Sequence, residues 1–417
     1  MKLSRRRLGL FLTGLGAALI AGQTLVPQAR MTGYGPSPRL GFSYDDLAGI
    51  DVLLNFLLFV PFGMGLRLSG ASRKRAATIA ALLSGVIELL QASVVTGRYS
   101  SVRDLLMNTL GALAGALLVD GWRRLAFPSP AVARRLCLLG AACWLLMSAG
   151  EAALLERALP PTIWYGQWAP EGVFPARFTG QLLAVRLDSL ELPGRRLPDA
   201  NRVRAALLQD RWTLTVEATT GEPTSGLGSV FSIFDDRHRE VLVVGQKGTD
   251  LLVRYRTRAS NFGFRSPSIV LPRAFAFPAG QPIRISMSFD RGVIALTSTC
   301  FGRIVSREAS ITPAWGWCLL LPFDAPIGTL AKLWVGIRIA VLILPIGYWT
   351  GRASATLAPP AVGGLVVVIG TALIPLPFRL PPAGPWEWLP GGVGFFTGWW
   401  IARAARRTDW EKRDAPF

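Results

Sequence analysis

The sequence predicts a mixed membrane protein, in which a polytopic bundle of about eight transmembrane helices carries an extracytoplasmic antiparallel β-sandwich. Of its 417 residues, 51% are apolar and only 17% are charged, a composition too hydrophobic for a soluble protein. Apolar runs near the bilayer-spanning length of about 20 residues occur in the N-terminal third and after residue 329. Between them lie short alternating runs separated by turn residues, which is typical of antiparallel strands.

The apolar runs give the predicted transmembrane helices in order. They occupy residues 8–26, 51–68, 76–95, 105–122, 136–155, 330–349, 361–376 and 388–402. The four richest short clusters of Lys and Arg fall on one side of the membrane if the N-terminus is cytoplasmic. The positive-inside rule therefore predicts a bacterial-type cytoplasmic (inner) membrane protein with both termini inside. The alternative for 8–26 is a cleaved signal peptide, which would leave the downstream topology unchanged.

The polar stretch between the fifth and sixth runs reads as a β domain. Strands are predicted at 211–219, 229–234, 241–245, 250–256, 283–290 and 293–299. The segments WTLTVEA (212–218) and SMSFDRG (286–292) resemble the concanavalin A-like or laminin G-like jelly-roll domains. That resemblance implies a sandwich that binds a sugar or a protein on one face.

Charged residues of the β domain suggest one contact surface. Arg254, Arg256 and Arg258 alternate along one predicted strand and could meet an anionic glycan, polymer or lipid surface, or could simply face water. Bound calcium is the alternative use of the acidic residues, but Asp235 and Asp236 fit a turn better, because no dense run of acidic ligands surrounds them.

The second and fourth apolar runs begin with the same polar pattern. Asp51 precedes Asn55, and Asp104 precedes Asn108, each by four residues. At helical spacing the two side chains of a pair lie on one face, one turn apart. Polar groups at membrane depth are costly and commonly mark a functional site. Gly111 and Gly115 form a small-xxx-small step that predicts close helix packing.

Three further residues complete the predicted site, namely Glu88, Gln91 and Arg98. The topology places all seven side chains in the outer leaflet. These motifs, with Phe59, Pro61 and Gly63, resemble the VanZ-like family over residues 45–120. The resemblance implies a polytopic cell-envelope protein whose biochemical activity is not established. The family is named for a glycopeptide-resistance accessory protein.

Three function classes remain open. The leading hypothesis is a non-enzymatic envelope factor that recognises a polar lipid head group or a lipid-linked or polymeric glycan through this cluster. The sandwich would provide a second contact to the same polymer or to an envelope protein partner. The alternatives are a membrane enzyme or transporter acting on a lipid-linked precursor, with Glu88 or Asp104 handling a proton, and a scaffold that only anchors the sandwich.

Other chemistry finds little support in the residues. The single histidine, His238, lies in a predicted turn, so histidine triads and clustered histidine metal sites are excluded. No cofactor or metal is predicted. The net charge of +19 comes with no nucleic-acid motif, which excludes nucleic acid as the expected partner. Cys300 and Cys318 belong to the outward domain, where a disulfide is permitted but not specified by sequence.

The predicted domains follow from these boundaries. Residues 1–155 form a five-helix VanZ-like region, 156–328 the extracytoplasmic sandwich, 329–402 a three-helix C-terminal region and 403–417 a basic cytoplasmic tail.

Overall fold

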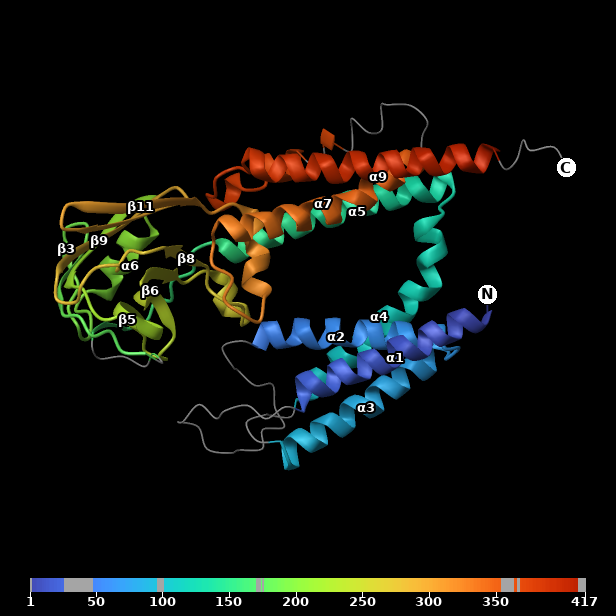
Figure 1. The fold of residues 1–417 in the computed structure, drawn as a ribbon, viewed down its shortest axis with the longest axis horizontal. Helices are drawn as coiled ribbons and strands as arrows, with labels where there is room; N and C mark the ends of the chain where they lie inside the picture. The colour runs from blue at the N-terminus through green and yellow to red at the C-terminus, as the bar shows by residue number, and fades with distance from the viewer. Residues whose placement is uncertain are drawn as a thin grey trace. The chain divides into compact units, whose positions relative to one another are not determined.

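The chain divides into two compact units in a computed structural model (Figure 1). The structure describes residues 2–25, 48–95, 101–169, 174, 176–353, 364–365 and 368–411. The first unit contains Met1–Ser129 together with Phe262–Phe264, and the second contains Pro130–Asn261 and Arg265–Phe417.

Four helices build the first unit. They are α1 (Lys2–Thr24), α2 (Ala48–Leu68), α3 (Arg73–Ser93) and α4 (Val102–Ala126). Helix α3 begins where Ser72 accepts a hydrogen bond from the Arg75 backbone nitrogen at 3.2 Å, an N-cap that satisfies a free donor of the first turn. The core of the unit contains the fully buried side chains of Phe59, Ala80 and Ala112.

The backbones of helices α2 and α4 lie in direct contact, with no side chain between them at several glycines. A Cβ atom at Gly63 would collide with the carbonyl oxygen of Ala112, and one at Gly111 would collide with that of Phe56. A Cβ atom at Gly115 would meet the carbonyl oxygen of Val60. The predicted packing role of Gly111 and Gly115 is therefore confirmed, and Gly63 belongs to the same contact.

Three long helices belong to the second unit. They are α5 (Pro130–Leu155), α7 (Thr329–Ala353) and α9 (Pro385–Glu411), and Figure 1 shows them side by side. A short 3₁₀ helix, η3 (Leu376–Phe378), precedes α9. Glycine again permits close contact, since a Cβ at Gly398 would collide with the carbonyl oxygen of Leu344 on α7.

Five described helices are long and apolar enough to cross a membrane. These spans are Gly49–Leu68, Arg73–Ser93, Val102–Ala126, Pro130–Leu155 and Leu330–Ala353. The predicted total of eight is not confirmed. The first predicted span lies in α1 and the last in α9, neither of which is among the five. The seventh falls partly outside the described residues, which retain the shorter apolar helix Val368–Phe378.

The β domain consists of two antiparallel sheets. The first has the order β1-β5-β6-β7-β8 and the second the order β11-β10-β9-β4-β2-β3. The strands are β1 (Trp164–Trp168), β2 (Leu182–Leu187), β3 (Leu190–Glu191), β4 (Arg211–Thr219), β5 (Thr224–Asp235), β6 (Glu240–Gly248), β7 (Asp250–Tyr255), β8 (Ser268–Leu271), β9 (Pro282–Asp290), β10 (Val293–Cys300) and β11 (Arg303–Ser310). Short helices are α6 (Ala200–Leu208), η1 (Arg258–Phe262) and η2 (Pro313–Leu320).

Alternating sequence explains the pairing of the central strands. Leu214 and Val216 on β4 are buried and lie opposite Met287 and Ile285 on β9, which are buried too. Residues of period two share one face of a strand, so this register brings the apolar faces together. The six predicted strands are present, whereas the sequence did not predict β1, β2, β3, β8 and β11.

The turn between β5 and β6 is built around Asp235. Its buried carboxylate accepts hydrogen bonds from the backbone nitrogens of Arg237 and Arg239 at 3.0 and 2.9 Å, and pairs with the Arg239 side chain at 2.7 Å. His238 is exposed there at a positive φ of 58°. The prediction that Asp235 and His238 are turn residues is confirmed.

Asp235→Ala is expected to lower the free energy of unfolding by about 2 kcal/mol, because two backbone amides and the Arg239 side chain lose a buried, charged acceptor. Asp236→Ala is the matched control, since Asp236 is exposed in the same turn. Thermal unfolding followed by circular dichroism measures the difference. Equal effects of the two substitutions would contradict this role of Asp235.

The fifth predicted span belongs to the second unit, although the sequence placed it with the first four helices. The reason is packing, because α5 contacts α7 and η2. Glu151 on α5 also forms an ion pair with Arg338 on α7.

Candidate functional site

The predicted polar residues gather at one end of the helical bundle in the first unit. Asp51 and Asn55 lie near the start of α2, Glu88 near the end of α3, and Asp104 and Asn108 near the start of α4. Because α3 and α4 are antiparallel neighbours, the end of one meets the start of the other. We call these five residues the acidic-amide cluster.

Hydrogen bonds connect the carboxylates of the cluster to neighbouring segments. Glu88 Oε2 accepts a hydrogen bond of 2.6 Å from the backbone nitrogen of Ser101, the residue before α4. Asn55 hydrogen-bonds to the Asp104 side chain, which joins α2 to α4. Asp104 also interacts electrostatically with Asp51 and with Glu88. Three helices therefore bring like charges together.

Deeper in the bundle, Asn108 is 2% exposed and its Nδ2 donates to Ser84 Oγ at 2.8 Å. Its Oδ1 and the Oδ1 of Asp104 are both buried without a hydrogen-bond partner among the described residues. Buried polar atoms are nearly always paired, so two unpaired acceptors in one cluster require an explanation.

Not every predicted residue joins the cluster in the same way. Gln91 on α3 donates instead to the carbonyl oxygen of Thr24 at the end of α1, at 2.9 Å. Arg98 lies outside the described residues. Arg103 is the described cation that acts on Asp104.

At the opposite end of the bundle the carboxylate is paired with cations. Asp120 on α4 pairs with Arg67 on α2 at 2.7 Å and with Arg73 on α3 at 2.5 Å. The ion pairs of Asp120 therefore join three helices through opposite charges. In the acidic-amide cluster, by contrast, the carboxylates outnumber the described cations.

The predicted arginine row of the β domain is engaged internally. β7 ends at Tyr255, so only Arg254 lies on the strand. Arg254 pairs with Glu240 at 3.0 Å, Arg256 is 3% exposed and donates to Asn261, and Arg258 pairs with Glu156 at 2.7 Å. The three guanidinium groups therefore stabilise loops and strand ends.

A second buried ionic group was missed by the sequence reasoning. Glu151 on α5 is 6% exposed and binds Arg338 on α7 through both carboxylate oxygens. Glu387 on α9 is 2% exposed and interacts electrostatically with both. The signal was present, because Glu151 and Arg338 are opposite charges within two apolar runs.

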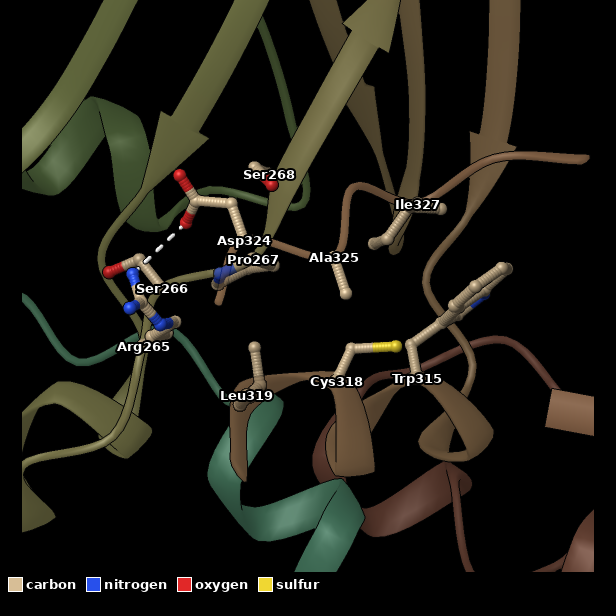
Figure 2. A pocket seen from close by; sticks show the side chains of 10 residues that line it. All are labelled: Arg265, Ser266, Pro267, Ser268, Trp315, Cys318, Leu319, Asp324, Ala325 and Ile327. Carbon is tan, nitrogen blue, oxygen red and sulfur yellow. Dashed lines mark hydrogen bonds and ion pairs between the residues drawn. The ribbon is translucent and has the colours of Figure 1, made fainter. Parts of the chain in front are cut away.

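Figure 2 shows a small cavity of the second unit near Cys318, beside Trp315 and Leu319. Its volume is about 10 Å³, and the nearby charges are already satisfied, since Arg265 donates to Asp324 at 3.2 Å. Burial raises the pKa of the Cys318 thiol to about 12, and Cys300 and Cys318 are both free. This cavity has neither the room nor the reactive thiolate for a site.

The described part of the chain contains no group of three His, Cys, Asp or Glu residues placed to hold a metal ion.

Comparison with known proteins adds one family. Residues 16–123 match the model of the VanZ/LLP1 family, which covers the predicted motifs and the helices that carry the acidic-amide cluster. Searches of the curated proteins and of the solved structures found no significant match. No family was identified for the β domain, so its concanavalin A-like or laminin G-like character stays a prediction.

Proposed function

We propose that this membrane protein, which carries a VanZ-like domain, binds the polar group of a lipid or a lipid-linked glycan at the outer leaflet through the acidic-amide cluster. The observation that supports this is the pair of buried acceptors, Asp104 Oδ1 and Asn108 Oδ1, without partners among the described residues. A ligand that donates hydrogen bonds would satisfy both.

The chemistry of the cluster defines the ligand class. Carboxylates and amide oxygens accept hydrogen bonds, so sugar hydroxyls and ammonium groups are the complementary donors. Asp51, Glu88 and Asp104 repel one another when all are charged, and a cationic or hydroxyl-rich group among them would relieve that repulsion. A purely anionic group would increase it.

The side of the membrane is part of the proposal. From the distribution of Lys and Arg we infer that the cluster and the β domain lie outside the cytoplasm and that both termini lie inside. The β domain would then offer a second contact, to the same polymer or to an envelope protein partner, which raises avidity without a tight individual site.

The test compares ligands that co-purify with the wild-type protein and with the double variant Glu88→Gln/Asn108→Ala. After purification in mild detergent, mass spectrometry identifies the bound lipids and lipid-linked sugars. The wild type is expected to retain one species that is reduced at least about tenfold in the variant, because hydrogen bonds to charged groups contribute about 1.5–3 kcal/mol.

Thr109→Ala is the matched control, because Thr109 is the next residue on α4 and its hydroxyl donates within the helix, to the carbonyl oxygen of Leu105 at 2.8 Å. Membrane abundance must be equal in all three proteins. Equal lipid content would contradict the proposal and favour the scaffold hypothesis. Chemical turnover of the retained species in a product assay would identify the enzyme alternative.

A further inference from the structure

One cavity of the second unit plays no part in the site described above. Its volume is about 460 Å³, against about 10 Å³ for the cavities near Cys318 and near Glu151. Small-molecule sites commonly measure about 300–1,000 Å³. The lining joins the end of α5, the β domain and the segment around η3.

Arg157 forms one wall and is held rigidly. Its Nη1 donates to the carbonyl oxygens of Leu207 and Gln209 at 2.5 and 2.9 Å, and its guanidinium carbon lies 4.1 Å from the centroid of the Phe289 ring. No carboxylate forms a salt bridge with it among the described residues. Asp210 acts on Arg157 electrostatically without forming a salt bridge in the described structure. A fixed guanidinium that no carboxylate binds directly is suited to bind an anion.

Arg379 contributes a second cation to the lining. It adopts the left-handed conformation, with φ 55° and ψ 34°, which is uncommon for a residue with a side chain. Its side chain is 74% exposed, and its Nη1 lies 3.6 Å from the Oδ1 of Asp210. Arg157 and Arg379 both line this cavity and repel one another electrostatically, while Asp210 attracts both.

The lining also contains apolar side chains, a tyrosine and one carboxylate, Glu156, which is paired with Arg258 at 2.7 Å. Phe289, Ile311 and Leu380 are buried in the wall. Burial raises the pKa of the Tyr255 hydroxyl, which therefore keeps its proton and remains a donor near Arg157. Two cations and a hydroxyl donor beside apolar walls fit an anionic amphiphile better than a free polar solute.

The position of the cavity along the helices supports a lipid. Glu156 and Arg157 directly follow α5, a helix long and apolar enough to cross a membrane, and Pro377–Leu380 is where the apolar helix Val368–Phe378 ends. Leu373 and Leu376 beside it are 55% and 57% exposed. Acyl chains could follow these side chains while the head group enters the cavity.

We propose that this cavity binds the phosphate of an anionic membrane lipid between Arg157 and Arg379. The site is separate from the acidic-amide cluster in residues and in charge, so the two proposals can fail independently.

The test uses the full-length protein in detergent and a short-chain phosphatidylglycerol as the probe, with binding measured by isothermal titration calorimetry. Saturable binding is expected. A diacylglycerol with the same chains, which lacks the phosphate, should bind at least about tenfold more weakly, as expected for loss of charge-assisted hydrogen bonds. Arg379→Gln should weaken phosphatidylglycerol binding by about the same factor.

Arg284→Gln is the matched control, because Arg284 is also an exposed arginine, with 66% of its side chain accessible and one carboxylate partner, Glu217, at 2.9 Å. It should leave binding unchanged. Leu208→Trp should block the cavity without a change of charge, since Leu208 lines it and is 38% exposed.

Three outcomes would overturn the proposal. If Arg379→Gln and Arg284→Gln weakened phosphatidylglycerol binding equally, the lipid would be attracted to the net positive charge of the protein and not to this cavity. Equal binding of diacylglycerol would remove the phosphate from the interaction. Competition by inorganic phosphate at concentrations as low as those of the lipid would assign the cavity to a soluble anion.

Discussion

Arg338→Leu is expected to lower the free energy of unfolding by about 3–5 kcal/mol, because it leaves Glu151 buried without its cation. Glu151 is 6% exposed, and both of its carboxylate oxygens bind the guanidinium. Glu387 stands close enough to repel the remaining charge. Unfolding in mixed micelles with rising sodium dodecyl sulfate, followed by tryptophan fluorescence, measures the loss.

The double variant Glu151→Leu/Arg338→Leu should recover most of that loss, since a buried ion pair can often be replaced by apolar residues at little cost. Arg211→Leu is the control. Arg211 pairs with Asp290 at 3.0 Å, but both side chains are more than half exposed, and such pairs contribute about 0–1 kcal/mol. If Arg338→Leu cost no more than Arg211→Leu, the buried pair would not stabilise the second unit.

This pair shows why part of the site chemistry escaped the sequence. Glu151 and Arg338 are 187 residues apart in the sequence. Hydropathy identifies the two apolar runs that contain them, but it does not predict that these two helices pack against each other. Asp51 and Asp104 were found because their motifs repeat locally, at the helical spacing of four residues. Long-range pairing between single charges leaves no such local pattern.

The β domain shows the same limit in another form. β4 was predicted at 211–219 because each inward residue alternates with a polar one, and the strand has those bounds. β11 was missed because its buried positions are few, as expected at an edge of a sheet. Likewise Arg256 was assigned to a solvent-facing row, but the strand ends before it and its guanidinium turns inward to Asn261.

Gly111→Ala is expected to lower the free energy of unfolding of the first unit by about 3 kcal/mol. An added Cβ would collide with the carbonyl oxygen of Phe56, a backbone atom that cannot move without shifting α2. Overpacking of this kind costs about 1–3 kcal/mol or more, which exceeds the gain of about 0.5–1 kcal/mol from replacing a helical glycine by alanine. Unfolding in mixed micelles measures the net change.

Gly121→Ala provides the control on the same helix, because a Cβ at Gly121 meets nothing within 4 Å. There the helix-propensity gain is unopposed, so the substitution should be neutral or stabilising, opposite in sign to Gly111→Ala.

Gly111 lies one turn beyond Asn108, so a shifted α2 would also draw Asn55 away from Asp104. Gly111→Ala should therefore reduce both lipid retention and the free energy of unfolding. Gly121→Ala should reduce neither of them. Equal stability of the two variants would contradict the backbone contact between α2 and α4.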